Sequence, residues 1–134
     1  MHSLLSSQDG RRRTLGYIGL VLLLLIIPVK LLRYGSAAGQ VLVGVAPSLL
    51  GPSGLLFILP SSRGKVSQLT VTQLGILVGT VSVGLEMAQL VPRPGILARV
   101  HYTFDVLDLV ATVVSVSVAA LIAGLVLRGG GRAK

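Results

Sequence analysis

Residues 15–32 read LGYIGLVLLLLIIPVKLL and contain a single charged side chain, Lys30. An α-helix rises about 1.5 Å per residue, so a helix of this length approaches the roughly 30 Å thickness of a bilayer's hydrocarbon core. Arg11, Arg12 and Arg13 come shortly before the stretch, at the end of a polar head, residues 1–14. A basic patch before an apolar run predicts a first transmembrane helix whose N-terminus stays in the cytoplasm.

A cleaved signal peptide is the alternative for the same stretch. Its uninterrupted apolar core is short, and the sequence GSAAG at residues 35–39 offers small residues for cleavage. Pro28, Lys30 and Arg33 make a poor cleavage context, so we expect the segment to be retained as an anchor.

The apolar character extends along the chain, which has 134 residues, 52% of them hydrophobic and 12% charged, and a mean hydropathy of +0.87. Further apolar segments cover residues 38–59, 74–91 and 105–127. The pattern predicts an all-α, multi-pass transmembrane helical bundle of four spans over residues 15–127, followed by a basic tail, residues 128–134. The segment 38–59 contains Pro47, Gly51, Pro52 and Gly54, so a re-entrant loop is the alternative there.

The distribution of basic residues selects between these topologies. With four spans, one side holds eight basic residues, namely Arg11, Arg12, Arg13, Arg63, Lys65, Arg128, Arg132 and Lys134, and the other side holds Lys30, Arg33, Arg93 and Arg99. With a re-entrant second segment, the side of the N-terminus would hold five against seven. Because basic residues concentrate in the cytoplasm, we expect four spans with both termini cytoplasmic.

The net charge of +8 does not indicate nucleic-acid binding, because the basic residues lie at the edges of apolar runs, where they contact lipid headgroups. We therefore expect the lipid bilayer as a partner and no nucleic acid. A membrane-protein partner and a homo-oligomer are both compatible with the pattern. The absence of cysteine excludes disulfides and thiolate metal sites.

Three of the four acidic residues lie within residues 84–110, GLEMAQLVPRPGILARVHYTFDVLDLV. Glu86 and Gln89 are three residues apart in the third span, as are Asp105 and Asp108 in the fourth, and Thr112 follows Asp108 by four. Residues at these spacings share one helical face, so two polar stripes on consecutive helices are predicted to meet at the outer interface.

The connection between these helices contains two prolines, Arg93, Arg99 and His101. Its Pro-Arg-Pro-Gly start predicts a stiff turn. Charged groups in a membrane segment cost about 2.5–3.5 kcal/mol each at a helix centre and therefore tend to pair or to line a wet cavity. Arg93 or Arg99 is a candidate partner for Glu86, and His101 for Asp105 or Asp108.

Other roles compete for these residues. Asp105 and Asp108 also fit helix capping, and Glu86 also fits a buried salt bridge between helices. A metal site of Glu86, His101, Asp105 and Asp108 matches no familiar ligand spacing, so we expect no metal and no cofactor. No serine lies in a nucleophile motif, and Ser115 and Ser117 fit helix packing, so we assign no catalytic residue.

Residues 74–124 resemble the VanZ-like family of small bacterial membrane proteins. The resemblance rests on Glu86 and Gln89 ending one helix, an arginine in the turn, and FDVLDLVAT opening the last helix. It assigns the family's aspartate to Asp108 and its turn arginine to Arg93 or Arg99. The family's asparagine is Thr112 here, and the glycine-rich continuation is replaced by VVSVSVAALIAG, as in a divergent member. The family is named for a member linked to resistance against the glycopeptide antibiotic teicoplanin, and its mechanism is poorly defined.

The resemblance implies a multi-pass protein of the bacterial inner (cytoplasmic) membrane. We therefore expect a cell-envelope protein whose polar residues bind or exclude a ligand such as a lipid-linked cell-wall precursor or an amphiphilic antibiotic. Glu86 and Asp108 would act as acceptors, Arg93 and Arg99 as contacts for a phosphate or carboxylate, and Gln89 and Thr112 as hydrogen-bond partners. One alternative is a structural or accessory subunit in which the polar residues only join the third and fourth helices. The least favoured alternative is an intramembrane enzyme or proton-coupled carrier that uses Glu86.

Overall fold

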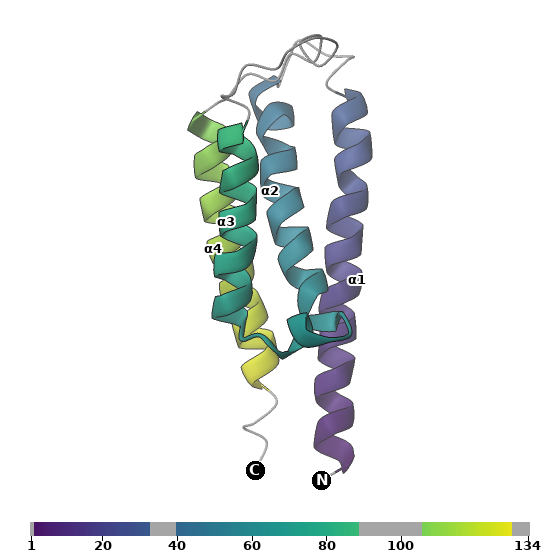
Figure 1. Cartoon of the computed structure of the whole chain (residues 1–134). Coiled ribbons are helices and arrows are strands. Elements are labelled where there is room, and N and C mark those ends of the chain that lie inside the picture. Colours follow the sequence, from purple (N-terminus) through teal and green to yellow (C-terminus); the bar gives the residue numbers. More distant parts are fainter. Residues whose placement is uncertain (1, 33–39, 89–105, 130–134) are drawn as a thin grey trace.

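The computed structural model describes residues 2–32, 40–88 and 106–129. The described part of the chain is helical and contains no β-strand. Its long helices, α1 (His2–Leu32), α2 (Gln40–Ile58), α3 (Val71–Ala88) and α4 (Val106–Arg128), stand side by side as an up-and-down bundle (Figure 1). All four are long enough and apolar enough to cross a bilayer. The all-α class and the four apolar helices expected from the sequence are therefore confirmed.

The start of α1 and the end of α4 lie at the same end of the bundle, which we call the terminal end (Figure 1). There the Arg11 guanidinium donates a hydrogen bond of 2.8 Å to the carbonyl oxygen of Val126. The last four carbonyls of a helix have no acceptor role within it, and a cation is favoured at this negative end of the helix dipole. Arg11, which the sequence identifies only as a topology signal, thus also caps α4 from across the bundle.

The first helix is longer than the predicted span. It begins at His2 and continues through the three arginines, whereas hydropathy places its start at residue 15. Hydropathy detects only the part of a helix that suits a bilayer, and a polar helical extension does not register on it. The second helix follows the expected segment closely, despite Pro47 and Pro52 inside it.

Two glycines allow α1 and α2 to approach until their backbones touch. A Cβ atom added at Gly19 would lie 2.5 Å from the carbonyl oxygen of Gly54, and one at Gly54 would lie 2.9 Å from that of Gly19. Both distances are shorter than van der Waals contact. Small residues that bring backbones together are a common basis of helix association in membranes, where apolar burial contributes little between helices.

The connection from α2 to α3 is short and ordered by its own hydrogen bonds. It contains two 3-10 turns, η1 (Leu59–Ser61) and η2 (Lys65–Gln68), separated by Gly64, whose φ of 101° suits glycine. Thr70 and Gln73 then start α3 with a capping box: Gln73 N donates to Thr70 Oγ1, and Thr70 N donates to Gln73 Oε1. This segment holds the Arg63 and Lys65 loop at the terminal end.

Apolar burial is greatest in α4 and α2 and smallest in α1. Of the apolar window of α4, 33% is buried, against 11% for α1. The buried cluster joins all four helices through Leu15, Leu56, Phe57, Val78, Val116, Ala119 and Ala123. The half of the bundle towards the opposite end contains the polar residues considered next.

Candidate functional site

The site begins with a proline inside α2. Pro52 has no backbone N–H, so it cannot donate to the carbonyl of the residue four positions earlier, which is Ser48. A carbonyl without a donor is costly in an apolar environment unless another group reaches it.

Hydroxyl groups of α4 reach the carbonyls beside this proline. Thr112 Oγ1 donates to the carbonyl oxygen of Ser48 at 3.4 Å, and Ser115 Oγ donates to that of Leu49 at 2.5 Å. Thr112 and Ser115 are buried, with 1% and 7% of their surfaces exposed. They are three residues apart and so lie on one face of α4. These two hydrogen bonds join α2 to α4.

Glu86 of α3 meets α2 at the same level. The Ser48 hydroxyl donates to Glu86 Oε1 at 3.4 Å, a long hydrogen bond, and the Glu86 side chain is half-buried. Ser48 therefore bridges two helices: its carbonyl accepts from Thr112, and its hydroxyl donates to Glu86. We call Ser48, Glu86, Asp108 and Thr112 the polar cluster.

Asp108 lies one turn before Thr112 in the first turn of α4, where its charge complements the helix dipole. Its Oδ1 atom is buried and has no hydrogen-bond partner among the residues that the structure describes. A buried carboxylate oxygen without a donor is destabilising, by roughly 1–3 kcal/mol for an unsatisfied buried polar group. Asp108 Oδ1 therefore makes no helix-capping hydrogen bond with the described residues.

The hydrogen bond between Thr112 and Ser48 places these two residues at the same height along the bundle. Their helices, α4 and α2, run in the same direction (Figure 1). By this register, Gly44, one turn before Ser48, stands at the level of Asp108. A Cβ atom added at Gly44 would meet no atom within 4 Å. A larger side chain would therefore fit at Gly44 among the described residues.

The remaining residues assigned from the sequence lie outside the described residues. These are Gln89, Arg93, Arg99, His101 and Asp105. Their pairing with Glu86 and Asp108 stays a prediction.

The described contacts include a link through α2 that the sequence pattern did not predict. Glu86 and Thr112 each form a hydrogen bond with Ser48 of α2. The junction of the third and fourth helices through two polar stripes stays a prediction. Ser48 was not singled out from the sequence. A signal was present, since a serine four residues before a proline carries the carbonyl that the proline leaves free.

Serine and threonine hydroxyls in α4 divide into two roles. Ser115 contributes to the junction with α2, whereas Ser117 is exposed and donates to the carbonyl of Val113 in its own helix at 2.8 Å. The expectation of helix packing therefore applies to Ser115 and not to Ser117.

The chemistry of the polar cluster is that of an acceptor site. Two carboxylates and two hydroxyls can receive hydrogen bonds or face a positive charge, and carboxylates form the stronger charge-assisted bonds. Within the ranges described, no three His, Asp or Glu side chains gather in a way that could hold a metal ion.

Comparisons with known proteins assign no function to the chain, so the geometry of the polar cluster is the basis for a functional proposal. No family model, no curated protein and no solved structure matches the chain. The resemblance to the VanZ-like family therefore stays a prediction that rests on the residues quoted for it.

Proposed function

We propose that the chain is a multi-pass protein of the bacterial cytoplasmic membrane whose polar cluster binds an amphiphilic ligand of the cell envelope. The observation that carries this proposal is the buried Oδ1 of Asp108, which has no partner among the described residues and lies one turn from the bridge between Thr112 and Ser48. A ligand that donates a hydrogen bond or carries an ammonium group would satisfy this oxygen.

The position of the cluster supports an amphiphilic ligand. Glu86 and Asp108 lie close to the ends of α3 and α4 that face away from the terminal end, so a polar group at the interface could reach them while its apolar part stays in the bilayer. Lipid-linked wall precursors and lipoglycopeptide antibiotics combine amide, hydroxyl or ammonium donors with an acyl or prenyl tail. The VanZ-like resemblance, with its teicoplanin link, points to the same class.

A structural role is the second candidate, because Thr112 and Ser115 stabilise α2 without any ligand. In that role the chain is an accessory subunit and the polar cluster only fastens helices. The two candidates differ in what the carboxylates of Glu86 and Asp108 are needed for.

Isosteric amides separate these candidates. We expect Glu86→Gln and Asp108→Asn to keep membrane abundance and thermal stability in detergent close to wild type, because shape and hydrogen-bonding capacity are largely retained. Both should abolish the difference in teicoplanin susceptibility between cells that carry the chain and cells that lack it. The matched control is Asp9→Asn, which removes the same charge from an exposed position in α1 and should preserve that difference.

The opposite result identifies a purely structural cluster. Lower abundance of Glu86→Gln and Asp108→Asn, with recovery in the apolar double variant Glu86→Leu/Asp108→Leu, would show that the carboxylates serve only to join helices. If the amide variants fold well and keep the wild-type difference in teicoplanin susceptibility, the proposed ligand site is equally excluded.

A further inference from the structure

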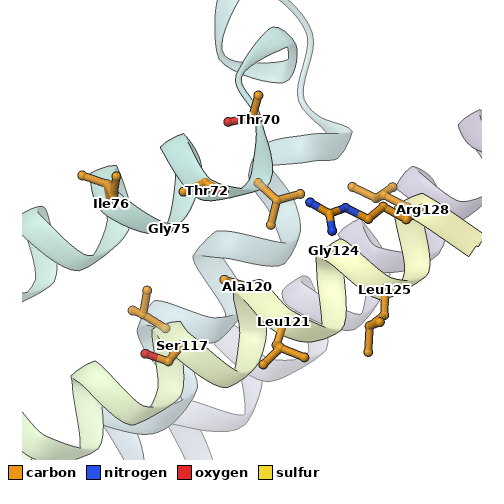
Figure 2. Close-up of a pocket in the computed structure, with 13 residues that line it drawn as sticks. Thr70, Thr72, Gly75, Ile76, Ser117, Ala120, Leu121, Gly124, Leu125 and Arg128 are labelled. Carbon is orange, nitrogen blue, oxygen red and sulfur yellow. The ribbon is translucent and has the colours of Figure 1, made fainter.

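A groove of about 700 Å³ lies between α3 and α4 near the terminal end, away from the polar cluster (Figure 2). Its apolar walls include Ile76, Leu121 and Leu125, which are 65%, 65% and 66% exposed. Side chains with this exposure on helices that suit a bilayer face lipid. The groove therefore opens sideways, towards the acyl chains of the membrane.

The groove exists because the two helices separate along their length. At Gly79 and Gly75 they are close: added Cβ atoms would lie 3.7 Å from Val116 Cγ1 and 3.5 Å from Ala120 Cβ. One turn further along α4, a Cβ atom at Gly124 would meet nothing within 4 Å. The absence of a side chain at Gly124 thus leaves space between α3 and the last turns of α4.

One end of the groove is polar and positively charged. Thr70, Thr72 and Arg128 line it, and Figure 2 shows the Arg128 guanidinium directed towards the space between the helices, at the same end as Thr70. The Thr70 hydroxyl accepts a hydrogen bond from Gln73 N and still carries a proton to donate. The N-terminus of α3 adds positive dipole character at the same place.

The surrounding charge has the same sign. Arg11, Arg12, Arg13, Arg63 and Lys65 also lie at the terminal end, where Asp9 is the acidic residue among those described. An anionic headgroup is therefore attracted to this end.

We propose that the groove binds one anionic glycerophospholipid, with an acyl chain between α3 and α4 and the phosphate at Arg128. The proposal requires membrane insertion, as proposed above, but does not require the polar cluster to bind a ligand. The lipid fills the space at Gly124, and Arg128 and the threonine hydroxyls donate to its phosphate.

Native mass spectrometry of the purified full chain in neutral detergent tests the proposal, with phosphatidylglycerol and phosphatidylcholine of identical acyl chains as probes. We expect one phosphatidylglycerol per chain, bound more tightly than phosphatidylcholine. Arg128→Gln should weaken phosphatidylglycerol binding about fivefold, whereas Arg128→Lys, which keeps the charge, should retain most of it. The matched control is Arg63→Gln, a basic residue of the same end that does not line the groove.

A second pair of variants tests the acyl chain. Gly124→Leu fills the groove at a position with no neighbour within 4 Å and should weaken binding of both lipids, whereas Gly84→Leu, also without a neighbour but outside the groove, should not. Inorganic phosphate at the same concentration should not compete, because the acyl chain contributes to binding. Thermal unfolding of each variant checks the fold.

Several outcomes overturn the proposal. Equal losses in Arg63→Gln and Arg128→Gln would show a general surface charge effect, and unchanged binding in Gly124→Leu would show that the chain does not enter the groove. Competition by inorganic phosphate would identify a headgroup site alone. A wild-type dimer that Gly124→Leu dissociates would identify a second copy as the occupant. Since none of these variants changes Glu86 or Asp108, a failure here is distinct from a failure of the ligand proposal.

Discussion

The carbonyl oxygen of Ser48 depends on α4 because Pro52 removes its donor within α2. In lipid, a hydrogen bond between helices contributes on average about 0.6 kcal/mol, since the unfolded segments also find partners. We expect Thr112→Val with Ser115→Ala to lower the free energy of unfolding by about 1–2 kcal/mol in total, as two donors to α2 carbonyls are lost. Unfolding in mixed micelles with increasing SDS measures the change.

A double-mutant cycle tests whether Pro52 is the reason that the hydroxyls of Thr112 and Ser115 stabilise the protein. Pro52→Ala supplies a backbone N–H that can donate to the carbonyl of Ser48. In that background, Thr112→Val with Ser115→Ala should lower the free energy of unfolding by about half as much. Ser117→Ala is the control, because Ser117 bonds within its own helix, and it should change stability by less than about 0.5 kcal/mol. An identical cost with and without Pro52 would mean that the hydroxyls do not compensate for the proline.

At the scale of the helices, the closest contact is the crossing of α1 and α2 at Gly19 and Gly54. We expect Gly19→Ala to destabilise the bundle by about 1–3 kcal/mol, because the new methyl group would overlap the carbonyl oxygen of Gly54 and push the two backbones apart. The midpoint of thermal unfolding in detergent should fall accordingly.

Gly84→Ala is the matched control for this crossing. It makes the same chemical change in α3, where an added Cβ atom meets nothing within 4 Å, so its stability should be unchanged or slightly higher. Equal midpoints for Gly19→Ala and Gly84→Ala would contradict a backbone contact between α1 and α2.

At the scale of the whole molecule, the start of α1 and the end of α4 lie at the same end of the bundle. The Arg11 guanidinium of α1 donates a hydrogen bond there to the carbonyl of Val126 in α4. The distribution of basic residues predicts that this end is cytoplasmic. The chain has no native cysteine, so single cysteines report the topology directly. In intact cells, an impermeant thiol reagent should label Leu97→Cys and leave Ser62→Cys unlabelled until the membrane is opened. Labelling of Ser62→Cys alone in intact cells would reverse the predicted orientation.

The number of long helices and the approximate position of each followed from the sequence. Length and hydropathy suffice for this, because a bilayer requires a continuous apolar helix of fixed length whatever its neighbours are. Glu86 was also visible as a candidate, since an ionisable residue in an apolar helix is rare and costly in lipid. Thr112 was visible through its spacing of four residues from Asp108. That both contact Ser48 of α2 was not visible in the sequence.

Helix partners depend on contacts between residues far apart in the chain, and apolar periodicity does not encode them when every face of a helix is apolar. Only the tertiary structure shows that Thr112 and Ser115 of α4 donate hydrogen bonds to the α2 carbonyls near Pro52. The same holds for Arg11 at the end of α4 and for the groove at Gly124. The sequence thus determined a bundle of four membrane-length helices, whereas the tertiary structure decided which helices touch, because close packing and hydrogen bonding act between specific atoms that hydropathy does not distinguish.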